Sequence, residues 1–137
     1  MDRLRVLLAD DHEEFLDTVE RMLASEFEVI GRVQDGRALI EAADRLKPEV
    51  LVVDISMPIV NGISAAQRLL DSNPQAQVVF LTVHEEPDYV RAALATGARG
   101  YVVKSRMASE LSLAIKEVHA GRSYLSPSIS LEDRRTP

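Results

Sequence analysis

Two short runs, Val50-Leu51-Val52-Val53 and Val78-Val79-Phe80-Leu81, are apolar at every position. A strand with one face in water alternates apolar and polar residues, so strands of this composition are expected to be covered on both faces. Such coverage is typical of a parallel sheet between two layers of helices. Together with three further β-branched or leucine-rich runs, the sequence predicts five strands: 4–9, 27–33, 50–54, 78–83 and 100–103.

The segments between these strands carry apolar residues at three- and four-residue spacing, which predicts helices buried along one stripe. Five such stripes occur, the first made of Phe15, Val19, Met22 and Leu23. Gly97 and Gly121 follow the last two stripes, where helices commonly end in glycine. Alternating strands and helices with right-handed crossovers predict an α/β fold of the flavodoxin-like class: a doubly wound sandwich whose five-stranded parallel sheet has the order 2-1-3-4-5, with five helices.

In a sheet of this kind the ligand site lies beyond the carboxyl ends of the strands. Asp10 and Asp11 follow the first predicted strand and Asp54 ends the third, so three carboxylates are expected to converge there. Like charges at short range repel each other, and a hard divalent cation relieves this repulsion better than a proton does. Magnesium binds carboxylate and carbonyl oxygens and accepts phosphate oxygens as further ligands. The sequence therefore predicts a Mg²⁺ site with room for a phosphoryl donor.

Each of these residues also has an ordinary structural explanation. Asp10 and Asp11 could cap the helix that follows them, and Asp54 could form a turn ahead of a proline. The same edge carries two more polar groups, however, because Thr82 lies at the end of the fourth strand and Lys104 follows the fifth. Phosphoryl transfer needs a nucleophile, a metal, and donors or positive charge for the phosphoryl oxygens. Asp54, Mg²⁺, Thr82 and Lys104 meet that requirement as a set.

Four motifs stand at these strand ends: Leu-Leu-Ala-Asp-Asp-His at 7–12, Val-Val-Asp-Ile-Ser-Met-Pro-Ile-Val-Asn-Gly at 52–62, Phe-Leu-Thr at 80–82 and Gly-Tyr-Val-Val-Lys at 100–104. Together they resemble the receiver family of two-component response regulators, from about Leu4 to Gly121. The resemblance implies a receiver domain over residues 1–121 and a linker or disordered tail over 122–137. It also implies a signalling switch and not an ordinary enzyme, since a receiver catalyses only its own phosphoryl transfer and dephosphorylation.

The resemblance assigns roles around a metal ion. Asp54 would be the phosphoacceptor of a Mg²⁺-dependent reaction and would also contact the metal. Asp11 would be a direct ligand, and Asp10 would hold the water shell of the ion. Ser56 would lend its backbone carbonyl to the metal.

The resemblance assigns further roles around the phosphoryl group. Lys104 would pair with the acceptor and then with the phosphoryl group, to which Thr82 would supply its hydroxyl. Thr82 and Tyr101 would be the switch residues: Thr82 would move toward the phosphoryl group, and Tyr101, at the aromatic switch position, would enter the freed space and alter the face built from the fourth helix, fifth strand and fifth helix. Ser56 and His84 flank the acceptor and Thr82, so their side chains are expected to tune the rate of dephosphorylation.

Partners follow from the same resemblance. The phosphoryl source would be a phosphohistidine on a sensor histidine kinase or phosphotransfer protein, and homodimerisation on phosphorylation is a further expectation. The sequence Gly-Arg-Ser-Tyr-Leu-Ser-Pro at 121–127 is similar to the receiver end in regulators with a LuxR-type helix-turn-helix output, which would control transcription. No DNA-reading helix is expected in the residues after it, so the chain is either part of a longer regulator or a free-standing receiver.

The composition agrees with a signalling domain. A net charge of −6 gives no general attraction to nucleic acid, so DNA binding is expected only through an output domain. No cysteine is present for a disulfide or a thiolate metal site, and no apolar stretch approaches the ~20 residues needed to cross a bilayer. We expect a cytoplasmic protein without a signal peptide or membrane contact.

Two alternative functions from other classes do not fit these residues. A hydrolase of the haloacid dehalogenase type also uses an aspartate nucleophile and magnesium, but its Asp-x-Asp pattern after the first strand is absent. A flavodoxin-like nucleotide carrier needs a phosphate loop rich in glycine, serine and threonine, whereas the acidic residues 10–14 would repel a phosphate. A receiver that acts only as a protein-interaction module stays open. The geometry of the Lys104–Ser105 peptide also stays open, since many receivers have a cis proline after the lysine.

Overall fold

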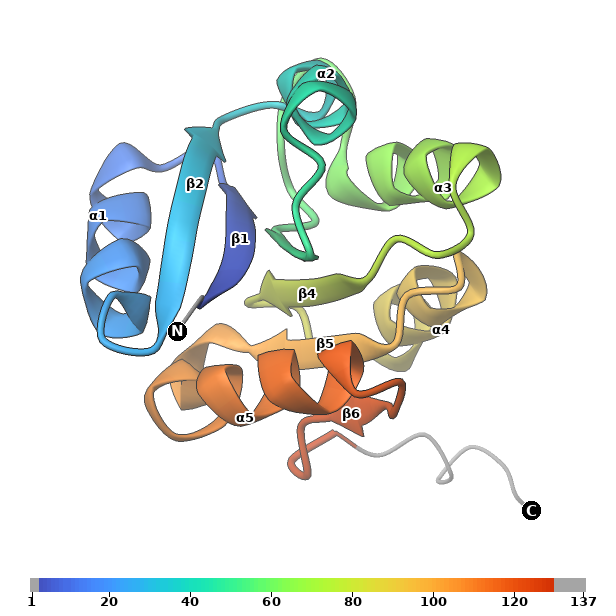
Figure 1. Cartoon of the computed structure of the whole chain (residues 1–137). Helices are drawn as coiled ribbons and strands as arrows, with labels where there is room; N and C mark the ends of the chain where they lie inside the picture. Colours follow the sequence, from blue (N-terminus) through green and yellow to red (C-terminus); the bar gives the residue numbers. More distant parts are fainter. Residues whose placement is uncertain (1–2, 130–137) are drawn as a thin grey trace.

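A parallel sheet forms the centre of the computed structural model, which describes residues 3–129 (Figure 1). The strands lie in the order β2-β1-β3-β4-β5-β6. Their bounds are β1 Leu4–Ala9, β2 Phe27–Val33, β3 Val50–Val53, β4 Val78–Thr82, β5 Gly100–Val103 and β6 Tyr124–Leu125. The helices are α1 Glu13–Leu23, α2 Gly36–Leu46, α3 Gly62–Ser72, α4 Pro87–Ala95 and α5 Met107–His119, with a 3₁₀ turn η1 at Lys104–Arg106. The predicted flavodoxin-like α/β class and the strand order 2-1-3-4-5 are confirmed.

Helices cover both faces of the sheet. On one face, a buried apolar cluster joins the sheet to α2, α3 and α4 through residues such as Leu39 and Val90. On the other face, a second cluster joins the sheet to α1 and α5 through residues such as Leu16 and Leu111. Every residue of β3 and β4 is consequently buried. This burial on both sides explains the two unbroken apolar runs of the sequence.

β6 is a sixth strand beyond the five predicted, and it corrects that number. It pairs with β5 in parallel, and Tyr124 N donates to Arg99 O (2.8 Å). One residue past β6, Ser126 N donates to Tyr101 O (2.9 Å). The side chains of Ser126 and Ile129 are buried, so the described part of the predicted tail packs on the domain. A two-residue strand is too short for any periodic pattern to reveal it.

Residues 130–137 of the predicted tail lie outside the described residues, and the domain boundary after Gly121 stays a prediction. Gly97 (φ 99°) and Gly121 (φ 88°) take the left-handed backbone just after α4 and α5, as expected of helix ends. The Lys104–Ser105 peptide is trans and opens η1, since no peptide bond within residues 3–129 is cis. In the same range, the helices are all too short or too polar to cross a membrane.

Candidate functional site

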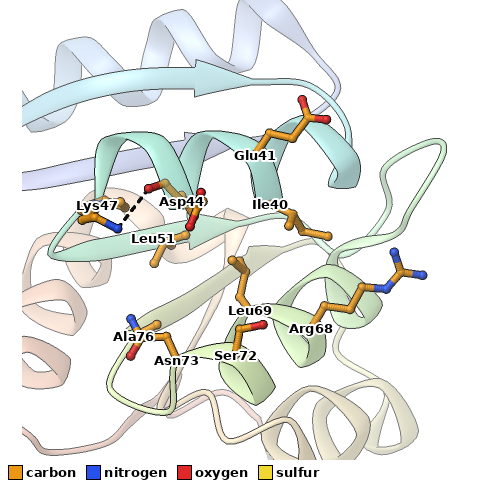
Figure 2. Close-up of a pocket in the computed structure, with 12 residues that line it drawn as sticks. Ile40, Glu41, Asp44, Lys47, Leu51, Arg68, Leu69, Ser72, Asn73 and Ala76 are labelled. Carbon is orange, nitrogen blue, oxygen red and sulfur yellow. Dashed lines mark hydrogen bonds between the residues drawn. The ribbon is translucent and has the colours of Figure 1, made fainter.

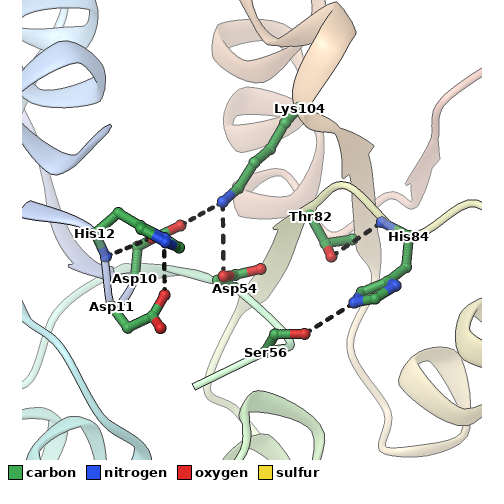
Figure 3. A network of polar contacts seen from close by, with 8 residues as sticks. All are labelled: Asp10, Asp11, His12, Asp54, Ser56, Thr82, His84 and Lys104. Carbon is green, nitrogen blue, oxygen red and sulfur yellow. Dashed lines mark hydrogen bonds and ion pairs between the residues drawn. The ribbon is translucent and has the colours of Figure 1, made fainter. Parts of the chain in front are cut away.

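The carboxyl ends of β1, β3, β4 and β5 meet at one edge of the sheet (Figure 3). β1 and β3 stay in register to their last residues, and Asp54 N donates to Ala9 O (2.9 Å). β4 and β5 are likewise paired at Thr82, and Lys104 begins η1 directly after β5. The structure therefore gathers most of the predicted site residues at this edge: Asp10, Asp11, Asp54, Ser56, Thr82, His84 and Lys104.

The Lys104 ammonium contacts the carboxylates of both Asp10 and Asp54. Its nitrogen lies 2.7 Å from Asp10 Oδ2 and 3.6 Å from Asp54 Oδ2. The same nitrogen lies 4.1 Å from the centre of the Phe15 ring. Because only 15% of the lysine side chain is exposed, water screens these charges weakly. Lys104 is thus placed to offset part of the negative charge of both carboxylates.

Asp54 is a buried acid, with 5% of its surface exposed. Burial raises the pKa of its carboxyl group above the ordinary value, and the Lys104 ammonium works in the opposite direction. The Asp10 and Asp11 carboxylates raise that pKa further, while a hydrogen bond from the Ile55 backbone lowers it. One lysine therefore does not fully compensate the carboxylates gathered here, and a second cation would stabilise the ionised form of Asp54.

The acidic pair has the features of a cation site. Asp10, Asp11 and His12 each place a ligand atom within 4.8 Å of the others. Asp11 Oδ1 is buried and has no hydrogen-bond partner within residues 3–129, although His12 Nδ1 lies 2.9 Å away. A buried oxygen without a donor costs free energy that a hard cation would recover. The pair therefore fits the predicted Mg²⁺, whereas Asp54 does not belong to this closest group.

Helix capping, the alternative role of the acidic pair, is seen in part for Asp10 and not for Asp11. Asp10 Oδ1 accepts from the backbone N–H of His12 (2.9 Å), the residue before the helix. Asp11 Oδ1 accepts no backbone hydrogen bond within residues 3–129, and its neighbour is the His12 ring at 2.9 Å, so this carboxylate oxygen has no capping role. His12 belongs to this cluster, although the sequence did not predict it as a site residue. The run Asp-Asp-His was the only sequence signal for it.

Ser56 and His84 form a second polar pair at the edge. Ser56 Oγ and His84 Nε2 are 2.8 Å apart. The backbone N–H of His84 donates to Thr82 Oγ1 (3.3 Å), and the His84 ring stacks on Tyr89 with centres 4.0 Å apart. His84 is therefore fixed by contacts on three sides, and Figure 3 shows it linked to both Ser56 and Thr82.

Tyr101, the predicted switch residue, points inward from β5. Its side chain is fully buried, and its hydroxyl donates to His84 O (2.8 Å). Burial raises the pKa of this hydroxyl far above neutrality, with a smaller contribution from Glu86, so the phenol stays a donor. The structure contains the inward position alone, so the movement of Tyr101 stays a prediction.

The start of α3 holds the loop that follows Asp54. The Asn61 side chain caps this helix by accepting from Ser64 N (2.9 Å), and Gly62 N donates to Ile55 O (2.7 Å). A Cβ on Gly62 would lie 1.9 Å from the Asp54 carbonyl oxygen, closer than any side-chain atom can approach. Glycine at this position therefore allows α3 to begin directly against the acceptor residue.

A cavity of about 790 Å³ opens between α2 and α3, away from this edge (Figure 2). It is lined by apolar side chains such as Ile40, Leu51 and Leu69, with Glu41 and Arg68 among its charged residues. None of the predicted site residues lines it. The candidate site is therefore the strand edge and not this cavity.

Comparison with known proteins agrees with the geometry. The family model described as "Response regulator receiver domain" matches residues 6–116. The transcriptional regulatory protein DegU of Brevibacillus brevis is 36% identical over 131 residues, which cover 94% of this chain and 56% of DegU. The chain thus spans little more than half the length of that curated relative.

Solved structures share the fold. A two-component response regulator of the LuxR family from Aurantimonas sp. SI85-9A1 superposes with a TM-score of 0.89 at 28% identity, over 93% of both chains. The isolated receiver domain of RcsB from Salmonella enterica serovar Typhimurium, in the presence of the phosphomimetic BeF3−, superposes with a TM-score of 0.83. That match has 26% identity and covers 93% of this chain and 95% of the other.

Proposed function

This chain belongs to the response regulator receiver family of two-component signalling, and from that premise we propose that it is a switch whose Asp54 accepts a phosphoryl group. One observation carries the proposal: the buried Asp54 lies 3.6 Å from the Lys104 ammonium, at an edge that also holds Asp10 and Asp11. A nucleophile, a fixed cation and a metal-binding acidic pair in one place are what phosphoryl transfer to a carboxylate requires.

The proposed reaction moves the phosphoryl group from a histidine to Asp54. A carboxylate oxygen of Asp54 forms a bond to phosphorus while the P–N bond of the phosphohistidine breaks, and the imidazole leaves with that electron pair. The Lys104 ammonium would pair first with the Asp54 carboxylate and then with a phosphoryl oxygen. The Thr82 hydroxyl would donate to another of these oxygens. Positioning and charge stabilisation would therefore supply most of the catalysis.

Mg²⁺ would be held by the carboxylates of Asp11 and Asp54 and the backbone carbonyl of Ser56, with Asp10 binding its water shell. When bound, the ion supplies positive charge that keeps Asp54 ionised and offsets the charge of the phosphoryl oxygens. The buried Asp11 Oδ1, which accepts no hydrogen bond within residues 3–129, supports this assignment, and so does the raised pKa of Asp54.

The switch would run through His84. Phosphorylation adds about −1.5 to −2 charge and three acceptor oxygens, so the Thr82 hydroxyl would turn toward them. Thr82 Oγ1 accepts from His84 N, and the Tyr101 hydroxyl donates to His84 O. These shared contacts support a path from Asp54 to Tyr101 and so to the face formed by α4, β5 and α5.

Dephosphorylation would be tuned by Ser56 and His84. Their 2.8 Å contact supports this role, because a side chain held by its partner is not free to orient a water molecule. Breaking the pair would release His84 for that purpose.

The proposed partners are a sensor histidine kinase or phosphotransfer protein as donor, and a second copy of the chain after phosphorylation. DegU is a transcriptional regulatory protein, which supports control of transcription through an output domain wherever this chain is part of a longer regulator. The chain itself would not bind nucleic acid directly, in keeping with its net charge of −6. A cytoplasmic location belongs to the same proposal.

The phosphoacceptor role is tested by mass spectrometry of the intact protein after incubation with acetyl phosphate and Mg²⁺. We expect one phosphoryl adduct, located on Asp54, that is absent with EDTA and in Asp54→Asn. Asp44→Asn, which changes an exposed acid of α2, should react like the wild type. A wild-type protein without an adduct at Asp54 would favour the phosphorylation-independent interaction module instead.

Dimerisation is tested separately by sizing the protein with and without Mg²⁺ and beryllium fluoride. A shift to twice the mass is expected on adding the phosphomimetic. An unchanged monomer would reject a second copy as the partner of this chain.

A further inference from the structure

We propose that Phe15 is a positioning residue for Lys104, an inference that rests on the proposed phosphoacceptor function. The Lys104 ammonium lies 4.1 Å from the centre of the Phe15 ring, well within the range of a cation–π contact. The same ammonium lies 2.7 Å from Asp10 and 3.6 Å from Asp54. The ring is thus a neutral partner of the lysine that is placed to meet the phosphoryl group.

Phe15 is well anchored for this task. It lies in the first turn of α1 and packs against the apolar cluster between α1, α5 and the sheet. The next residue, Leu16, and Val19 one turn later are buried in that cluster, so the helix that carries the ring cannot shift easily. Because α1 starts two residues after Asp11, the same segment fixes the ring and the acidic pair.

A ring face suits a lysine that must change partners. Lys104 is proposed to leave the carboxylates for a phosphoryl oxygen, and a third carboxylate beside it would compete for its N–H groups. An aromatic face attracts the cation through its quadrupole without accepting a strong hydrogen bond. With 15% of the Lys104 side chain exposed, the attraction is little screened by water. Phe15 can therefore hold the ammonium near the acceptor in both states.

The test compares leucine and tyrosine at position 15. Phe15→Leu keeps an apolar side chain but removes the π face, whereas Phe15→Tyr keeps the face. For Phe15→Leu we expect about three- to tenfold slower phosphorylation by acetyl phosphate in saturating Mg²⁺, with rescue by tyrosine. Met22→Leu is the matched control, since Met22 is a half-buried residue of the same helix and cluster. That variant should react at the wild-type rate.

Two measurements separate positioning from a loss of packing. In proton NMR spectra of the 137-residue wild type without any phosphoryl donor, the ring should shift the methylene protons beside the Lys104 ammonium upfield. Phe15→Leu should return these signals toward those of an exposed lysine. In a Lys104→Met background, Phe15→Leu should cause no further loss of rate, because the group that it positions is already absent.

The outcomes distinguish this inference from the proposed function. A wild type that forms no adduct overturns the phosphoacceptor proposal and the positioning role with it. An active wild type whose Phe15→Leu variant reacts equally fast, or loses the same factor in the Lys104→Met background, overturns the positioning role alone. Wild-type Lys104 signals without an upfield shift also overturn it, whatever the stability of the variants.

Discussion

The folded protein disfavours the ionised form of Asp54. Its pKa in the folded protein is raised above the ordinary value of 3.8, chiefly because the carboxyl group is buried. An acid of this kind binds its proton more tightly when folded, so its contribution to stability is largest at low pH. That contribution is lost as the pH rises from 3.8 through the raised value of the folded state. At neutral pH the Asp54 charge therefore opposes folding.

Asp54→Asn should accordingly stabilise the protein in the absence of divalent metal. We expect the free energy of unfolding in urea, with EDTA at neutral pH, to rise by about 1 kcal/mol, because a buried carboxylate beside two others becomes neutral. The gain should shrink as the pH falls through the raised pKa of the folded-state Asp54 carboxyl group, where the wild type takes up its proton. Asp44→Asn, an exposed matched control, should change little at either pH. A less stable Asp54→Asn would contradict the unfavourable charge.

The positions of single residues were predictable where the backbone alone decides them. Asp10, Asp54 and Thr82 lie at or just after strand ends, and a parallel sheet brings such ends to one edge whatever the side chains are. The contact of Phe15 with Lys104 was not predictable, because it depends on how α1 packs on the sheet and on the rotamer of a long side chain. In the sequence Phe15 looked like an ordinary member of a helical stripe.

At the scale of elements, β6 ties the chain beyond α5 to the strand that precedes Lys104. Ser126 Oγ donates to Glu110 Oε1 of α5 (2.5 Å) and accepts from Val103 N of β5 (3.0 Å). Both side chains are buried, with Ser126 at 0% and Glu110 at 8% exposure. The free edge of β5 is therefore covered, and β6 forms part of any output face that includes β5.

Ser126→Ala should weaken this attachment. The change leaves the Val103 N–H and a Glu110 oxygen without their partner, so we expect a loss of about 1–3 kcal/mol in the free energy of unfolding. Ser128→Ala, at an exposed position two residues away, should cost less than about 0.5 kcal/mol. Urea denaturation measures both, and the Val103 N–H, which loses its acceptor, should exchange hydrogen faster than in the wild type. Equal stability of the two variants would mean that the buried serine is dispensable.

The sequence predicted the elements that have a clear apolar period, but it did not always predict the residue at which each element ends. The third and fourth strands end one residue earlier than predicted, at Val53 and Thr82. The next residue in each case, Asp54 or Val83, leaves the ladder and borders the site. Strand β6 was missed because its pairing is decided by β5 and by the buried Glu110, which lie far from it in sequence.

For the whole molecule, Mg²⁺ should act as a stabilising ligand. A cation that binds the folded site and not the unfolded chain adds about 1.4 kcal/mol at ten times its dissociation constant. We expect thermal unfolding to move upward with Mg²⁺, and Asp11→Asn to abolish the shift. Sodium chloride at equal ionic strength is the control, because any salt screens a chain of net charge −6. An equal Mg²⁺ shift in Asp11→Asn would place the cation elsewhere.

The parallel pairing of β6 with β5 also has a mechanical side. Tension applied at Ile129 along the strand direction would load the bonds Tyr124 N to Arg99 O and Ser126 N to Tyr101 O together, in shear. Bonds loaded together resist a pull better than bonds opened one after another. The force would pass first to β5, the strand that contains Tyr101 and precedes Lys104.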